Sequence, residues 1–291
     1  MRQLKKIQHK CEYFLFKYFL FIFALLPYRL SGSLASFLLA SLSHLFGANK
    51  IAKKNLEMVF PNHSKAQIDK IRQESWENMG RNFSEYAHFA KMKPNEIREK
   101  VNIKGKVYLE ELLRQNKNVI FFTAHYSNWE LSSLILAIEG FKMNGIYRPA
   151  NNSYIDKKVN LARKTNLNVS LHPKSRVGSI SFVKAIKAGE SGGILIDQKY
   201  RKGVKVSFFG KKAFSSTFIV NIAKKYKVSL VPAHVERLKN GDFEFIVEKP
   251  ITAESIEHKT DKQILQKLNK ILEKWIKRNP GQWFWVHNRW G

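Results

Sequence analysis

The chain of 291 residues is long enough to bury a sizeable core as one large domain, with or without an appendage. Its 51 Lys and Arg against 23 Asp and Glu give a formal net charge of +28, which predicts an anionic partner: nucleic acid, an acidic protein, a phosphorylated ligand or an anionic membrane surface. A hydrophobic fraction of 44% excludes a disordered chain, and the single cysteine, Cys11, excludes an internal disulfide and fits a reducing compartment.

The first segment, residues 1–47, begins with a basic cluster, which is followed by two short apolar runs. Uninterrupted apolar sequence extends only from Tyr18 to Pro27, which is shorter than the roughly 20 residues that cross a bilayer. A turn is expected at Ser31-Gly32-Ser33, before the second run. The segment therefore predicts a membrane anchor, either a helical hairpin in one leaflet or a single tilted helix with Lys17 at the interface. A cleaved signal peptide and two soluble core helices are the alternatives.

The next segment, residues 48–100, has the pattern of helices that pack on the rest of the chain. An amphipathic helix is expected from Asn49 to Phe60. Ser64 follows a proline-containing break and is expected to cap a long helix that extends towards Phe89.

From residue 101 to 291, strand and helix patterns alternate. The expected strands are Val119–Thr123, Lys142–Tyr147, Asn168–Leu171, Gly193–Ile196, Ser229–His234 and Phe243–Glu248. The expected helices are Trp129–Ile138, Ile155–Thr165, Ile180–Ala188, Phe214–Tyr226 and Lys262–Arg278. This order predicts an α/β body with a mixed central sheet flanked by helices, preceded by the N-terminal helical membrane-anchoring region.

One strand end carries a candidate acid–base pair. His125 follows the apolar run Val119–Thr123 and so lies at the carboxyl end of an expected strand, where ligand sites of open α/β sheets collect. Glu130 comes five residues later. A neutral imidazole beside a carboxylate is suited to general-base catalysis. Ser127 and Glu130 also match a capping box, so Glu130 has a purely structural alternative. The spacing differs from that of metalloprotease motifs and the other histidines are scattered, so neither a metal nor another cofactor is expected.

Ordered motifs along the chain resemble one known family. The segment AHYSNWE looks like the H-x4-[DE] motif of glycerolipid-type acyltransferases. Further matching segments are KKNLEMVFP, ENMGRNFSEY, YRPANN, Asp197-Gln198, VSFFGKKAFSS and NPGQWFWVHNRW. The whole set resembles the lauroyl/myristoyl acyltransferases of lipid A biosynthesis, within the lysophospholipid acyltransferase superfamily.

The resemblance implies a reaction, a set of site residues and a location. An acyl thioester on acyl carrier protein would be attacked by a 3-hydroxyacyl hydroxyl of an anionic lipid A precursor, with His125 as general base and Glu130 orienting its imidazole. Arg148 and Arg163 would bind phosphate, and Asp197 would place the substrate or an arginine. The location implied is the cytoplasmic face of the inner membrane of a Gram-negative bacterium, with the membrane surface as a partner and no nucleic acid.

Two other functions remain open at this stage. The first is acylation of a different glycolipid, such as a phosphatidylinositol mannoside. The second is a nonenzymatic basic protein that binds nucleic acid or a membrane.

The aromatic tail Trp283–Trp290 is expected to form an amphipathic edge strand or an interfacial belt, and His287 within it is expected to be structural.

Overall fold

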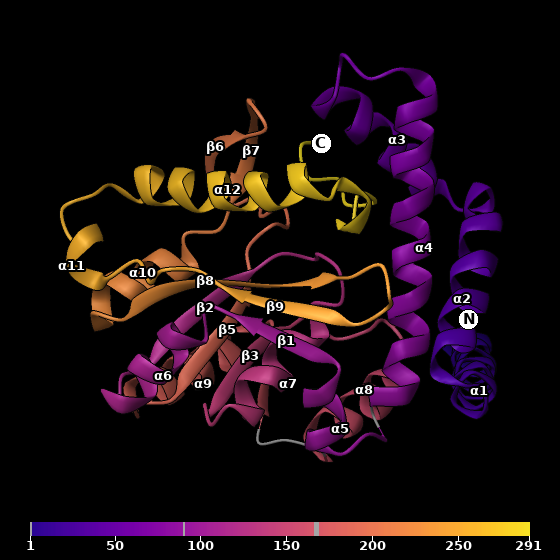
Figure 1. The fold of residues 1–291 in the computed structure, drawn as a ribbon, viewed down its shortest axis with the longest axis horizontal. Helices are drawn as coiled ribbons and strands as arrows, with labels where there is room; N and C mark the ends of the chain where they lie inside the picture. The colour runs from indigo at the N-terminus through magenta and orange to yellow at the C-terminus, as the bar shows by residue number, and fades with distance from the viewer. Residues whose placement is uncertain (1, 90, 166–168) are drawn as a thin grey trace.

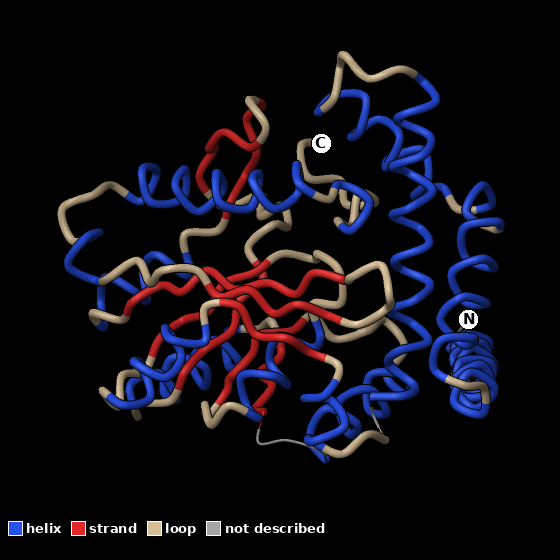
Figure 2. The backbone as a smooth tube through the Cα atoms, in the orientation of Figure 1, coloured by secondary structure: helices blue, strands red, loops and turns tan. Residues whose placement is uncertain are grey.

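The computed structural model, which describes residues 2–89, 91–165 and 169–291, is built around a seven-stranded sheet (Figures 1 and 2). The side chains of Arg2, Leu4 and residues 161–165 lie outside this description. The strands are β1 (Val101–Lys104), β2 (Val119–Thr123), β3 (Met143–Tyr147), β4 (Val169–Pro173), β5 (Ser191–Leu195), β8 (Ser229–Arg237) and β9 (Phe243–Val247). Their order is β1-β9-β8-β2-β5-β3-β4, and only the β8–β9 pair is antiparallel. The expected mixed sheet is confirmed.

Helices cover both faces of this sheet because its buried strands present apolar side chains in both directions. In β2, Ile120 and Phe122 enter one core, and Val119 and Phe121 enter the other. The first core is completed by α9 (Arg176–Lys187), α10 (Phe218–Tyr226), α11 (Ala253–Ile256) and α12 (Asp261–Arg278). The second is completed by α5 (Pro94–Glu99), α6 (Lys106–Arg114) and α7 (Glu130–Ile138). Figure 1 shows α12 above the sheet and α6 and α7 below it.

The expected strands and helices of the body are present, and most differ from expectation only at their ends. Three strands were not assigned from the sequence: β1 and the hairpin of β6 (Val204–Phe208) and β7 (Lys211–Ser215). The helix expected from Phe214 begins at Phe218, because Phe214 pairs with Lys205 in the hairpin. Helix α8 (Ser153–Thr165) follows β3, as expected.

The N-terminal region contains α1 (Arg2–Leu25), α2 (Tyr28–Ser41), the 3₁₀ turn η1 (Ser43–Leu45), α3 (Gly47–Val59) and α4 (Lys65–Phe89). Figure 1 shows α4 standing along one end of the sheet, with α2 beside it. Ser64 is the cap expected for α4: its hydroxyl accepts the Gln67 backbone N–H at 3.3 Å, and the Gln67 side chain accepts the Ser64 N–H at 2.7 Å.

The turn expected at Ser31-Gly32-Ser33 is wrong. The chain turns at Leu26–Pro27, and α2 begins at the next residue. Ser31 and Gly32 lie inside α2 and are buried. A Cβ at Gly32 would already lie 3.8 Å from side-chain atoms of Arg81 and Ser84, so a glycine here suits the close approach of α2 to α4. Figure 1 shows α1 nearly along its axis while α2 runs across the view, so the two helices do not form an antiparallel hairpin. Among the described residues, no helix combines the length and the apolar character needed to cross a bilayer.

Candidate active site

His125 and Asp197 form a hydrogen-bonded pair at the carboxyl edge of the sheet. His125 follows β2 and Asp197 follows β5, and these strands are parallel neighbours with Thr123 opposite Leu195. The Nδ1 atom of His125 lies 2.8 Å from Oδ1 of Asp197. The pairing of strands that are distant in sequence therefore brings an imidazole and a carboxylate together where ligand sites of α/β sheets lie.

The Asp197 carboxylate is fully buried and fully hydrogen-bonded. Its Oδ2 atom accepts the backbone N–H of His125 and the indole N–H of Trp283, each at 2.9 Å. Burial alone would raise the pKa of Asp197, but the positive charge available on His125, the hydrogen bonds from His125 and the charge of His287 hold it well below its usual range. Asp197 is therefore a carboxylate at neutral pH.

The Asp197 contact fixes the tautomer of His125. An ionised carboxylate can only accept, so Nδ1 of His125 carries the proton and donates it to Asp197. The Nε2 atom is then an acceptor, and the side-chain nitrogen of Gln198 lies 3.2 Å from it. The His125 side chain is 15% exposed. In the neutral ring this geometry leaves the lone pair on Nε2, the atom a general base would use, with the Gln198 amide placed to donate to it.

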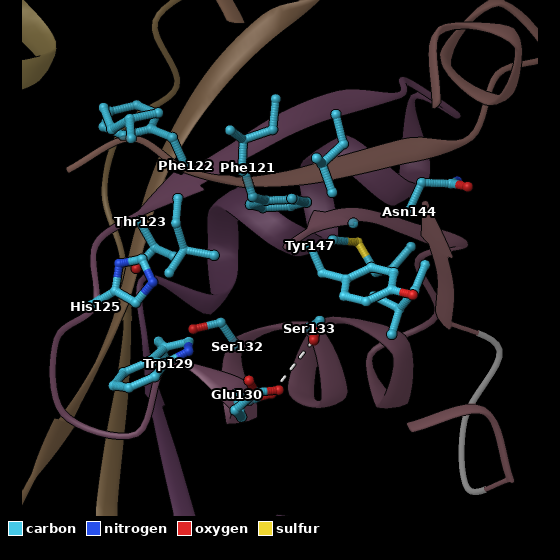
Figure 3. Close-up of a pocket in the computed structure, with 18 of the residues that line it drawn as sticks. Phe121, Phe122, Thr123, His125, Trp129, Glu130, Ser132, Ser133, Asn144 and Tyr147 are labelled. Atoms are coloured by element: carbon cyan, nitrogen blue, oxygen red, sulfur yellow. Dashed lines mark hydrogen bonds between the residues drawn. The ribbon is translucent and has the colours of Figure 1, made fainter. Parts of the chain in front are cut away.

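The structure changes the roles expected for two acids. Asp197, expected to place the substrate or an arginine, occupies the atom of His125 that an orienting carboxylate would bind. Glu130 lines the same cavity as His125, and in Figure 3 both side chains lie on one side of the pocket with Trp129 beside them. Asp197 therefore makes a contact at Nδ1 that suits an orienting carboxylate, the role that was expected of Glu130.

The capping box expected at Ser127 and Glu130 is also wrong. Helix α7 begins at Glu130 with Trp129 in the N-cap position and no side-chain cap. The backbone N–H of Ser127, which Glu130 would have accepted, donates to the carbonyl of Gln282 at 2.7 Å. Ser127 has a left-handed backbone, with φ of 50°. The Ser127 N–H therefore bonds to Gln282, which is distant in the sequence, and not to the Glu130 side chain.

The aromatic tail enters the core instead of forming an edge strand or an interfacial belt. Trp283, Trp285 and Arg289 are each at most 1% exposed. The tail passes beside the His125–Asp197 pair, because the Phe284 N–H donates to the carbonyl of His125 at 3.0 Å. Sequence reasoning missed this role of the tail. The motif resemblance included the segment, but nothing in its spacing connects it to His125.

His287 lies against His125, with ring centroids 4.7 Å apart in an edge-to-face arrangement. Burial, together with the charge on His125, lowers the pKa of His287 to about 4, although Asp197 opposes this. Its Nε2 atom is buried and has no hydrogen-bond partner among the described residues. His287 is therefore neutral at physiological pH and borders the site.

His125, Asp197 and His287 are the residues of the described chain whose side chains could converge on a metal ion, with one ligand atom from each within 4.8 Å of the others. Both oxygens of Asp197 already accept protein hydrogen bonds. The carboxylate therefore needs no cation to compensate its burial.

An apolar cavity of about 870 Å³ opens beside His125 (Figure 3). Its volume lies in the range of small-molecule and cofactor sites. Apolar side chains from the sheet, α4, α7 and α10 form much of its wall: Phe89, Phe121, Leu131, Leu134, Met143, Val169, Leu171 and Ile219. Cations from two neighbouring segments also line it: Arg148 after β3, and Lys174 and Arg176 where β4 leads into α9. The site can therefore hold a long apolar group and an anion together.

The two arginines expected to bind phosphate are described to different extents. Arg148 follows β3, is exposed and lines the cavity. Arg163 lies in the last turns of α8, and its side chain is outside the described residues.

The family model for bacterial lipid A biosynthesis acyltransferases matches residues 1–291. The chain belongs to this acyltransferase family. The lipid A biosynthesis palmitoleoyltransferase of Escherichia coli is 27% identical over 82% of this chain and 77% of its own length. The lauroyltransferase of the same pathway and organism is 25% identical over 82% of this chain and 78% of its own length.

One solved structure shares a weaker likeness with this acyltransferase. It is the 1-acyl-sn-glycerophosphate acyltransferase of Thermotoga maritima, 13% identical over 87% of this chain and 97% of that chain, with a TM-score of 0.39.

Proposed function

We propose that this protein transfers a fatty acyl chain from acyl carrier protein to a 3-hydroxyacyl hydroxyl of a lipid A precursor. The observation that carries the proposal is the His125–Asp197 pair beside a large apolar cavity, in a chain that belongs to the lipid A biosynthesis acyltransferases. The relatives named for acyl transfer in lipid A biosynthesis support the same reaction class.

His125 acts as the general base. Its Nε2 atom removes the proton from the acceptor hydroxyl as the hydroxyl oxygen attacks the thioester carbonyl. The tetrahedral intermediate then collapses: the carbon–sulfur bond breaks, the thiolate leaves and takes a proton from the imidazolium. Asp197 stabilises that imidazolium through the Nδ1 contact. The products are an ester and the free carrier thiol, so no covalent acyl-enzyme is needed.

The remaining site residues bind the two substrates. The acyl chain lies in the apolar cavity, and Arg148 and Arg163 bind phosphate groups of the donor or acceptor, for which guanidinium groups are well suited. Glu130 lines the same cavity and contacts a polar group of a bound substrate. Asp197 is fully buried and is not among the residues that line the cavity, so it acts through His125.

The N-terminal helices supply the contact with the membrane surface. In α1 the exposed residues Phe14, Tyr18, Phe21 and Leu25 follow one another at intervals of three or four, as on one face of a helix. Their exposed fractions run from 59% to 67%. An amphipathic helix with such a face lies in the interface of a leaflet. This face supports contact with a membrane surface, and the relatives in lipid A biosynthesis support the cytoplasmic face of the inner membrane as its place.

The purified protein, incubated with acyl carrier thioesters and a lipid A precursor, tests this function. Wild-type protein is expected to produce the acylated lipid, and His125→Ala to lose about 10²–10⁴-fold in rate with unchanged vesicle binding. The absence of transfer by the wild-type protein with any acyl chain, or full transfer by the variant, would overturn the proposal. Acylation of a phosphatidylinositol mannoside in its place would identify a different acceptor.

A further inference from the structure

The loop from Ala124 to Trp129, here called the catalytic loop, is attached to α4 by side chains that lie on the helix's inner face. The side-chain amide of Asn82 donates to the carbonyl of Ser127 at 2.6 Å. Glu85 accepts the side-chain amide of Asn128 at 2.8 Å. Both contacts reach residues of the loop that follow His125 in the chain.

A buried ion pair holds these α4 side chains in place. The Arg237 guanidinium, at the end of β8, binds both carboxylate oxygens of Glu85 and donates to Asn82 Oδ1 at 2.7 Å. The Arg237 and Glu85 side chains are 9% and 4% exposed. Asn78 accepts from the same guanidinium at 3.3 Å. A bidentate pair with additional acceptors fixes the geometry of every group that it contacts.

The catalytic loop requires such support. Ser127 has φ of 50°, a conformation that a serine adopts at a cost in free energy and that surrounding contacts must impose. Its N–H and its carbonyl are both used, by Gln282 and Asn82 respectively. Without the Asn82 contact, the buried carbonyl of Ser127 would lose its shortest side-chain donor, and the loop would be free to relax towards an ordinary backbone.

We propose that Asn82 and the Glu85–Arg237 pair are positioning residues that hold His125 at its working distance from Asp197 and the acceptor hydroxyl. The proposal rests on the function proposed above, in which His125 is the base. Glu85 and Arg237 do not line the cavity, whereas Asn82 borders it. Their effect on the reaction passes through the catalytic loop and not through contact with the reacting atoms.

Asn82→Ala tests the proposal kinetically, with Asn118→Ala as the matched control. Asn118 is also half-buried and also donates its amide to a backbone carbonyl, that of Ile186 at 2.7 Å, but on another part of the sheet. Because a displacement of about 1 Å can cost about 10²-fold in rate, we expect Asn82→Ala to lower kcat by roughly ten- to a hundredfold with little change in KM, and Asn118→Ala to leave kcat within about twofold. A change confined to KM would instead identify a substrate contact and overturn the proposal.

A double-mutant cycle separates positioning from general damage. If Asn82 acts through His125, then Asn82→Ala in a His125→Gln background should cost less than about twofold in the residual rate, because residues that act as a unit are strongly non-additive. The same fold loss in both backgrounds would contradict the proposal.

Hydrogen exchange provides a test that does not depend on activity. Amides of residues 124–131 should exchange at least about tenfold faster in Asn82→Ala than in Asn118→Ala, because the loop opens more often. Unchanged exchange in this segment would overturn the proposal even if the rate fell. Faster exchange in a protein with no acyl transfer would retain the attachment of the loop and reject only the proposed reaction. Arg237→Lys, which keeps the charge but loses the bidentate contact, should give the same exchange pattern.

Discussion

His125 Nδ1 lies 2.8 Å from Asp197 Oδ1, although the two residues are 72 positions apart in the chain. The same carboxylate accepts the His125 backbone N–H, so Asp197 holds both the ring and the main chain of the residue that it serves. The contact is possible because β2 and β5 are adjacent and parallel. The orientation of the His125 imidazole therefore depends on the pairing of these two strands.

Asp197→Asn should reduce kcat by about 10³–10⁴-fold with a small change in KM. An asparagine amide can donate to Nδ1, which would stabilise the tautomer whose Nε2 carries the proton and cannot act as a base. Steady-state kinetics on folded variant protein measures the effect. A loss smaller than tenfold would show that Asp197 does not control the tautomer.

Replacing the exposed aromatic residues of α1 should weaken membrane binding. The double variant Phe14→Ser and Phe21→Ser removes two side chains that are 63% and 59% exposed. Burying one such side chain is worth about 1.5–3 kcal/mol, so binding to vesicles of phosphatidylethanolamine and phosphatidylglycerol should fall by at least about tenfold. Val107→Ser with Leu113→Ser, at exposed positions on α6, is the control. Equal losses in both double variants would argue against α1 as the contact.

The net charge of +28 predicts a salt-dependent encounter with anionic substrates. Raising the NaCl concentration from about 50 to about 300 mM shortens the range of that attraction, so KM for the carrier thioester should rise more than kcat falls. Initial-rate measurements at several salt concentrations test this, with a neutral osmolyte as control. A KM that does not respond to salt would remove the steering role of the basic surface.

The buried His234 should make the free energy of unfolding depend on pH. Burial, with the charges of Arg278 and Lys274, lowers its pKa to about 3, whereas an unfolded histidine titrates near 6.5. Between these two pKa values the unfolded chain binds more protons than the folded chain. The contribution of His234 to the free energy of unfolding is therefore complete above about pH 6.5 and is lost as the pH falls towards 3. From pH 7 to pH 5 it should amount to about 2 kcal/mol.

The variant His234→Phe isolates this contribution. It keeps an aromatic ring against Trp275, which stacks on His234 with centroids 4.2 Å apart. Urea unfolding at pH 7 and pH 5 should show a smaller pH dependence than in wild type. The exposed His258→Phe should retain the wild-type dependence. Equal pH dependence in wild type and His234→Phe would contradict the prediction.

Gly80→Ala should destabilise the contact between α2 and α4. A Cβ at this position would lie 2.3 Å from the carbonyl oxygen of Ala35, so one helix must move. Overpacking of this kind costs about 1–3 kcal/mol, measurable as a lower midpoint of thermal or urea unfolding. Gly47→Ala is the control, since a Cβ there meets nothing within 4 Å. Equal unfolding midpoints for the two variants would show that α2 and α4 can move apart without a loss of stability.

Local sequence patterns predicted the helices and strands, whereas contacts between distant residues determine how the side chains of the candidate site are arranged. The apolar run of β2 and the cap of α4 at Ser64 follow from neighbouring residues, and both are confirmed. The cap at Ser127 failed because its N–H is taken by Gln282, which no local pattern identifies. The Asp197–His125 contact depends on which strands are neighbours, and strand order is not encoded in periodicity. The prediction of an edge strand or interfacial belt for the tail failed for the same reason, because Trp283 is buried against Asp197, which is distant in the sequence.

The indole of Trp283 bonded to Asp197 has a consequence for biosynthesis of the protein. Synthesis runs from the N-terminus, so α1 leaves the ribosome long before the segment that contains Trp283. Until that segment emerges, the Asp197 carboxylate lacks one donor and the catalytic loop lacks the backbone contacts with Gln282 and Phe284. The apolar face of α1 is thus available before the site around His125 and Asp197 is complete. In the proposed function, membrane contact by α1 would therefore precede completion of the site during synthesis.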